Sequence, residues 1–357
     1  MPNNRVTRLR ELLANSEGKA ILITNPINRR YLTGFTGSSG VVLITADSAA
    51  LITDFRYKEQ APQQAQGYQI VEHGADIYAS VADLLRQWSI DSLLFEERDV
   101  TYSSYKTIEK ALSPVKLITS EGIVEKLRMI KDDSELAIMQ DAANLADRAF
   151  EHILGFIKPG VSEKAIALEL EVFMRSQGAT SSSFDTIVAS GERSALPHGV
   201  ASDRMIGRDE FVKLDYGAYY NGYCSDITRT VVVGKPSDKH REIYEIVREA
   251  QQYALDHLQP GMTGKEGDAL TRDIITRYGY GEYFGHGTGH GLGMEIHEAP
   301  RLSLTGDIVL VPGMTVTVEP GIYLPGFGGV RIEDDVVVTD KGIRILTSSP
   351  KQLIVLD

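Results

Sequence analysis

Two carboxylates lie in a predicted hairpin near the middle of the sequence. A two-residue Asn221-Gly222 turn places residue 217 opposite Asp226, and Asp215 has the same strand parity as residue 217. Because side chains alternate between the two faces of a strand, both Asp side chains are expected to project from one face, and a register shift of two would not separate them. Two acids this close together are candidates for binding a divalent cation.

A second predicted hairpin brings two more acids together. Glu319 ends an alternating strand, and a loop centred on Gly326 sets it opposite Glu333 on the returning strand. Four converging carboxylates would repel one another, and an unpaired carboxylate in a buried strand costs several kcal/mol. Two divalent cations roughly 3.5–4 Å apart, bridged by carboxylates and completed by one histidine, would remove this conflict. The four acids together therefore predict a dinuclear metal site.

Four histidines are candidates for the rest of the site. Three of them, His286, His290 and His297, lie between the two hairpins in a segment rich in glycine, which permits close approach of the backbone. The fourth is His198, in the loop segment Leu196-Pro197-His198-Gly199. A loop histidine taken alone is more often structural than functional, so the sequence position of His198 does not by itself assign it a role.

The motifs that contain these residues resemble those of the pita-bread metallopeptidases, and most closely the branch of Xaa-Pro aminopeptidases and prolidases. The resemblance rests on the order Asp, Asp, His, Glu, Glu in LDYGAYYNGYCSDITRT, HGTGHGLGMEIHEAP and TVEPGIYLPGFGGVRIEDD, and it covers nearly the whole chain. It implies that five residues bind two metal ions. Asp215 would be a terminal ligand of one ion, and Asp226 and Glu333 would bridge both ions. His290 and Glu319 would complete the coordination of the other ion. The oxygen-rich donor set suits Mn²⁺ and also accepts Co²⁺ or Zn²⁺.

The same resemblance implies roles for the remaining candidates. Glu319 would take the proton from the attacking water and pass it to the leaving nitrogen, although spacing alone does not distinguish it from Glu333. His198 and His297 would contact the substrate and the developing oxyanion, and His286 would lie near a proline pocket, with a structural role as the alternative. The last candidate is Arg331, which shares a strand face with Glu333 and is expected to orient that carboxylate.

The predicted activity is hydrolysis of the Xaa-Pro bond at peptide N-termini, as in an Xaa-Pro aminopeptidase that acts on peptides with proline at the second position. Prolidase, an Xaa-Pro dipeptidase, is the alternative. Prolidases often carry Arg at the position of Gly287, where it would suit the free carboxylate of a dipeptide, and the absence of that Arg favours the aminopeptidase. A metal-free creatinase-like hydrolase would need a broken ligand set, and a non-catalytic binding module is disfavoured by the complete one. The family also implies a homodimer.

The composition is that of an ordinary globular protein. The 357 residues are 42% hydrophobic and 24% charged, and the net charge of −12, without a run of Lys and Arg, argues against a nucleic-acid partner. No window has the roughly 18 apolar residues of a membrane span, and residues 1–19 lack the apolar stretch of a signal peptide. With Cys224 as the only cysteine, an intramolecular disulfide is impossible, and we expect a cytoplasmic protein without a membrane partner.

The sequence predicts two domains. Six short apolar runs between Ala20 and Thr119 alternate with helical patterns, which predicts a creatinase-like α/β domain at 1–123. Residues 124–357 combine four helical stretches with hairpin pairs, which predicts an α+β pita-bread domain with an antiparallel sheet packed against helices. The first of those helices is expected to begin at an Asp132 N-cap that pairs with Glu135.

Overall fold

Residues 2–357 are described by a computed structural model, in which the chain divides into two units, Met1–Arg128 and Met129–Asp357. The boundary predicted between residues 123 and 124 lies at the start of helix α6 (Ile123–Arg128). This helix packs with the first unit, where Arg128 Nη1 donates a hydrogen bond of 2.8 Å to Asn28 Oδ1.

A six-stranded mixed sheet forms the centre of the first unit, with the strand order β4-β3-β2-β1-β5-β6. All six predicted strands are present: β1 (Ala20–Ile23), β2 (Val41–Thr45), β3 (Ala49–Thr53), β4 (Gln69–Glu72), β5 (Ser92–Phe95) and β6 (Lys116–Thr119). The other helices of the unit are α1 (Pro2–Leu13), α2 (Pro26–Thr33), η1 (Phe55–Tyr57), α3 (Gln60–Gln64), α4 (Ile77–Gln87) and α5 (Tyr102–Leu112). Apolar residues of α4 and α5 recur at helical spacing and pack on the sheet, which is how a helix with one apolar stripe buries it.

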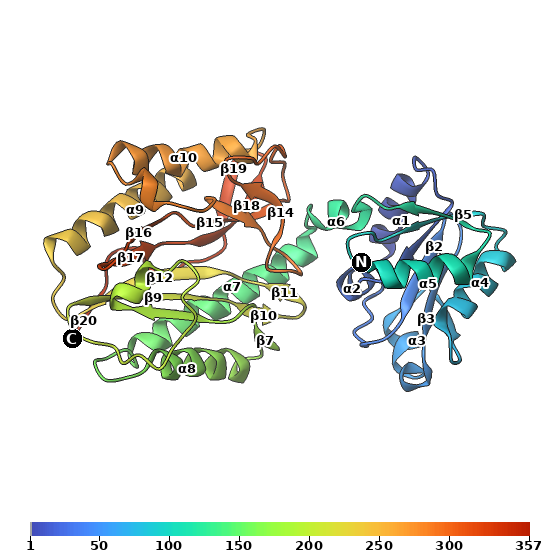
Figure 1. Cartoon of the computed structure of the whole chain (residues 1–357), viewed down its shortest axis with the longest axis horizontal. Coiled ribbons are helices and arrows are strands. Elements are labelled where there is room, and N and C mark those ends of the chain that lie inside the picture. The colour runs from blue at the N-terminus through green and yellow to red at the C-terminus, as the bar shows by residue number, and fades with distance from the viewer. Residues whose placement is uncertain (1) are drawn as a thin grey trace. The chain divides into compact units, whose positions relative to one another are not determined.

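Two pairs of helices enclose the strands of the second unit. These are α7 (Asp133–Leu154) with α8 (Glu163–Ser176), and α9 (Asp238–His257) with α10 (Gly264–Arg277). The predicted capping box is confirmed, since Asp132 accepts from the backbone of Glu135 while the Glu135 side chain accepts from the backbone of Asp132. Figure 1 shows the strands between the two helix pairs, a layered α+β architecture that agrees with the predicted fold class.

The strands of the second unit belong to four small sheets, ordered β11-β10-β7, β20-β12-β9-β8, β14-β13-β15-β18-β19 and β16-β17. Their bounds are β7 (Ser181–Ser182), β8 (Ile187–Ser190), β9 (Glu210–Tyr216), β10 (Ala218–Tyr220), β11 (Tyr223–Cys224), β12 (Ile227–Val233), β13 (Gly289–Gly291), β14 (Glu298–Leu302), β15 (Thr315–Val318), β16 (Gly321–Leu324), β17 (Gly328–Arg331), β18 (Asp334–Thr339), β19 (Gly342–Ile345) and β20 (Val355–Leu356). Two short 3-10 helices, η2 (Gly191–Ala195) and η3 (Gly281–Tyr283), complete the unit.

The register of both hairpins agrees with the prediction. Thr228 pairs with Asp215, the register predicted from residue 217 opposite Asp226. Val318 pairs with Asp334, the register predicted from Glu319 opposite Glu333. The strands are nevertheless interrupted where Asp226 and Glu333 lie. There the backbone N–H of Asp226 donates to Asp335 Oδ2 at 2.8 Å and that of Glu333 donates to the Thr228 carbonyl at 3.1 Å, bonds that join the two sheets where the acids converge.

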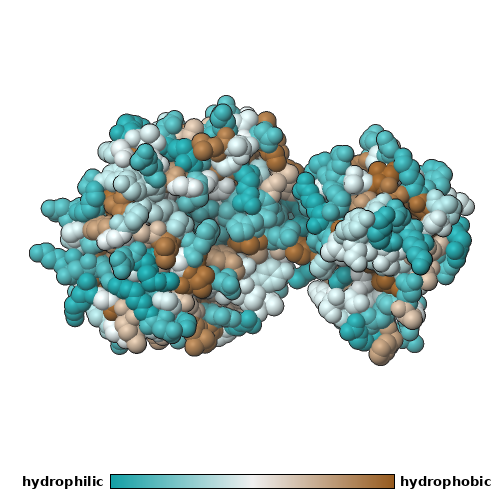
Figure 2. All heavy atoms as spheres, viewed as in Figure 1, coloured by the Kyte–Doolittle hydropathy of each residue, from teal (hydrophilic) through white to brown (hydrophobic). Residues whose placement is uncertain are grey.

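The surface drawn in Figure 2 is mostly hydrophilic, with hydrophobic residues in small separate groups. Within residues 2–357, no helix is both long enough and apolar enough to cross a bilayer.

Candidate metal centre

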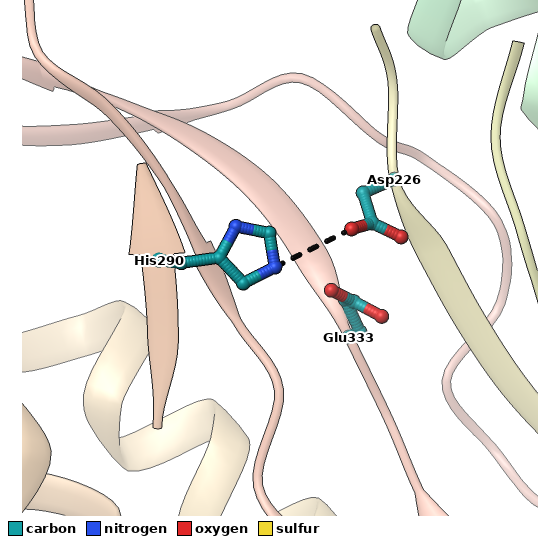
Figure 3. Close-up of side chains that lie close together, drawn as sticks. All are labelled: Asp226, His290 and Glu333. Atoms are coloured by element: carbon teal, nitrogen blue, oxygen red, sulfur yellow. Dashed lines mark ion pairs between the residues drawn. The ribbon is translucent and has the colours of Figure 1, made fainter. Parts of the chain in front are cut away.

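Asp226, His290 and Glu333 point toward one another from three different segments of the second unit. Figure 3 shows His290 on β13, Asp226 just before β12 and Glu333 between β17 and β18. One ligand atom from each residue lies within 4.8 Å of the other two, and all three side chains are buried. His290 Nε2 is 3.6 Å from Asp226 Oδ2, and the other oxygen, Asp226 Oδ1, is buried without a hydrogen-bond partner among residues 2–357.

His290 is held so that Nε2 faces the acids. Its Nδ1 lies 3.1 Å from the Gly291 carbonyl, which accepts the ring proton and leaves the Nε2 lone pair free. Its backbone N–H donates to Thr317 Oγ1 at 3.1 Å. Burial lowers the pKa of His290 to about 3, so the ring is neutral at physiological pH, as a metal ligand has to be.

Glu319 approaches the same ring nitrogen as Asp226, with Oε1 at 3.4 Å from His290 Nε2. Thr317 Oγ1 donates a hydrogen bond of 3.1 Å to that oxygen. Burial raises the pKa of Glu319 to about 7. The carboxyl therefore changes protonation state close to neutral pH in the metal-free fold, a property suited to proton transfer.

The acids repel one another in the metal-free fold. Burial raises the pKa of Asp226 well above its ordinary value, and the charges of Glu333 and Asp215 raise it further. Burial likewise raises the pKa of Glu333, followed by the charges of Glu319 and Asp215. Bound divalent cations would neutralise this repulsion and would satisfy the free Asp226 oxygen. The donor set thus fits a divalent-metal centre.

All nine predicted site residues line one cavity of about 600 Å³. Besides the five predicted ligands, its walls include His198, His286, His297 and Arg331. The ring centroids of His297 and His290 are 4.4 Å apart, so His297 borders the acid cluster directly. His286 uses both ring nitrogens within the protein, because Nδ1 is 2.8 Å from the Gly287 carbonyl and Nε2 is 2.8 Å from Tyr323 Oη.

Arg331, predicted to orient Glu333, forms no direct hydrogen bond or ion pair with that carboxylate within residues 2–357 and reaches it through Thr228. Arg331 Nη2 donates to Asp215 Oδ2, and Arg331 Nε lies 3.9 Å from Glu319 Oε2. Glu333 instead accepts from Thr228 Oγ1 at 2.5 Å, and Thr228 Oγ1 in turn accepts from Arg331 Nε at 3.0 Å. Strand parity correctly predicted that Arg331 projects toward the acids. Which acid it binds depends on which carboxylate lies within reach of the guanidinium.

Five residues that support or line the site escaped the sequence analysis. They are Thr228, Asp335 and Tyr323, which hydrogen-bond site residues or their backbone, Lys213, which bonds the backbone before His198, and Arg301, which lines the cavity. Strand parity could have found two of them, because Thr228 and Lys213 share parity with Asp226 and Asp215, respectively.

The fold and the buried acid cluster define a metallopeptidase with a creatinase-type N-terminal domain. The chain belongs to metallopeptidase family M24, whose pattern matches residues 137–340, and residues 5–130 match the creatinase/prolidase N-terminal domain. It is therefore an enzyme of the branch that includes Xaa-Pro aminopeptidases and Xaa-Pro dipeptidases.

Relatives of both activities cover almost the entire chain. An Xaa-Pro dipeptidase of Pyrococcus horikoshii is 39% identical over 353 residues, which are 99% of each protein. The structure of an Xaa-Pro dipeptidase from Bacillus anthracis superposes with a TM-score of 0.98 at 58% identity, covering 100% of both chains. An X-Pro aminopeptidase from Thermotoga maritima gives a TM-score of 0.92 at 41% identity, covering 98% of this chain and 100% of the other.

Proposed function

We propose that this protein is an Xaa-Pro dipeptidase, which hydrolyses dipeptides with proline at the second position. The observation that carries the proposal is Arg301, on β14, whose side chain is exposed and lines the active-site cavity. Its guanidinium forms no hydrogen bond or ion pair with any residue in the described range 2–357, so it is free to bind an anionic group of the substrate. A dipeptide has its free carboxylate on the proline residue, next to the scissile bond.

Arg301 lies close enough to influence the catalytic groups. It pairs with His290 across the β13–β14 ladder, and its positive charge lowers the pKa of His297, after the larger effect of burial. An Arg–carboxylate contact at this end of the cavity would align a dipeptide relative to the acid cluster. This arrangement favours the dipeptidase over the aminopeptidase.

The absence of Arg at position 287 therefore no longer favours an aminopeptidase. Gly287 itself carries no cation, but Arg301 lines the same cavity as Gly287. A Cβ atom at 287 would lie 2.7 Å from the Leu302 carbonyl oxygen, so a side chain at that position would require the backbone to shift. In the proposed dipeptidase, the cation that binds the substrate carboxylate is Arg301, on β14.

In the proposed mechanism, Asp215, Asp226, His290, Glu319 and Glu333 would hold two divalent ions, for which the oxygen-rich donors favour Mn²⁺. Such ions, when bound, lower the pKa of water and polarise the scissile carbonyl. Glu319 takes the proton of the attacking water and returns it to the proline nitrogen as the bond breaks. His198 and His297 hydrogen-bond the substrate and the oxygen on which negative charge develops.

The proposal also covers the cellular location and the oligomeric state of the enzyme. We propose a cytoplasmic location, supported by the lone buried thiol of Cys224, and a homodimer, supported by the family resemblance.

The test compares Ala-Pro, Ala-Pro amide and Ala-Pro-Ala with Mn²⁺ present. We expect kcat/KM for Ala-Pro to exceed that for the other two by about 10- to 100-fold, the effect of one charge-assisted hydrogen bond pair. Arg301→Met should raise KM for Ala-Pro by a similar factor while leaving the amide unchanged. The matched control is Arg208→Met, which alters an exposed arginine outside the cavity.

Equal or better cleavage of the amide and the tripeptide would identify an aminopeptidase instead. Replacement of proline by alanine in each substrate tests the specificity for proline. Both a dipeptidase and an aminopeptidase of this branch should cleave the alanine substrates slowly.

A further inference from the structure

The side chain of His198 has no partner that fixes its position. It is exposed to the cavity, and its ring forms no hydrogen bond or ion pair with any residue between 2 and 357. The His198 backbone carbonyl accepts a bond of 2.9 Å from the N–H of Val200, and Gly199 N–H donates to Leu196 at 3.2 Å. The place of the ring therefore depends on how firmly the preceding loop is held.

A buried lysine holds that loop. Lys213, on β9, is 0% exposed, and its Nζ donates to three of the four backbone carbonyls that precede His198. The distances are 3.1 Å to Ser194 O, 2.5 Å to Leu196 O and 3.3 Å to Pro197 O. Three N–H donors of one ammonium group thus match three carbonyl acceptors of one loop.

A second cation reaches the same loop. Arg331 Nη1 donates a bond of 3.1 Å to the Pro197 carbonyl, and its Nη2 donates to Asp215. Lys213 and Asp215 have the same parity on β9, so both project from the face that carries the site. Arg331 thereby connects the loop of His198 to the acid cluster, while Lys213 holds the loop from the same strand face.

Burial of Lys213 is energetically unfavourable for a residue with a purely structural role. Its Nζ lies 5.0 Å from the centroid of the Tyr323 ring and forms no ion pair with a carboxylate among the described residues. Burying an ammonium group without an anionic partner costs several kcal/mol, whereas a methionine at this strand position would bury its side chain without that cost. An aliphatic side chain, however, would leave the three carbonyls without their shared donor.

We infer that Lys213 is a positioning residue, which holds residues 194–197, the end of η2 and the loop that follows it, so that His198 meets the substrate. The inference rests on the proposed function, in which His198 contacts the substrate. It goes beyond that function by assigning the placement of His198 to a side chain that does not line the cavity.

The test is a double-mutant cycle with Lys213→Met and His198→Ala, using whichever Xaa-Pro substrate the wild-type enzyme cleaves. We expect Lys213→Met to lower kcat by about 10- to 100-fold with little change in KM, and never by more than His198→Ala does. In the His198→Ala background, Lys213→Met should have almost no further effect on kcat. The His297→Ala background is the matched control, and there the full effect of Lys213→Met should persist.

Metal content and thermal unfolding are measured for every variant, so that loss of metal or fold is not taken for loss of positioning. Should Lys213→Met not fold, Lys213→Gln, which keeps two N–H donors on a shorter side chain, passes through the same cycle. An unchanged kcat, or an equal loss of kcat in the His198→Ala and wild-type backgrounds, would overturn the inference. A wild-type enzyme that cleaves no Xaa-Pro substrate would instead refute the proposed function.

Discussion

His286 offers the most quantitative test of the electrostatics of the site. Its Nδ1 donates to the Gly287 carbonyl, so Nε2 accepts a hydrogen bond from Tyr323 Oη. Tyr323 Oη itself accepts from Arg331 Nη1 at 2.7 Å. A proton on Nε2 would reverse the bond to Tyr323 and leave its hydroxyl proton without an acceptor. Protonation of His286 is therefore disfavoured in the folded protein.

Burial, followed by the positive charge of Arg331, lowers the pKa of His286 from 6.5 to about 3. Because the folded pKa lies below the unfolded one, the resulting stabilisation is complete above pH 6.5 and is lost as the pH falls toward 3. At pH 5 the loss amounts to about 2 kcal/mol of unfolding free energy. His286→Gln, which cannot be protonated, has no such loss.

The assay is urea unfolding of the wild-type and His286→Gln proteins, both stripped with EDTA so that metal release does not contribute. We expect the variant to be less stable at pH 7 and its deficit to shrink by about 2 kcal/mol at pH 5. The deficit should be equal at pH 7 and pH 8, which serves as the internal control. A deficit that stays constant down to pH 5 would refute the reasoning, because it would mean that His286 is protonated as readily in the fold as in the unfolded chain.

Three other outcomes follow from the site. Wild-type protein should bind about two divalent ions per chain, and Asp226→Asn should lose both metal and activity, since the family resemblance makes Asp226 a ligand of both ions; elemental analysis and peptidase assays check this. His198→Ala and His297→Ala should each keep the metal but lower kcat/KM at least about 100-fold, and near wild-type kinetics would return that histidine to a structural role. Thr228→Val removes the hydrogen bond to Glu333 and should weaken Mn²⁺ binding about 10-fold in a metal titration, with unchanged affinity as the contrary result.

The sequence alone determined the parts of this protein that depend on local spacing. Strand parity and turn length placed Asp226 beside Asp215 and Glu319 opposite Glu333, and both registers occur in the structure. The Asp132 cap and the six strands of the first unit follow from equally local signals. These features are predictable because hydrogen bonding within a hairpin or a helix end is fixed by residues only a few positions apart.

Only the tertiary structure decided which side chains of different segments meet. Arg331 shares a strand face with Glu333, yet its guanidinium reaches Asp215, which is 116 positions earlier in the chain. Arg301 lines the same cavity as Gly287, and Lys213 reaches a loop 16 to 19 residues before it. Long side chains such as Arg and Lys span several ångströms, so parity gives the direction in which they point, while their partner depends on how separate sheets and loops pack.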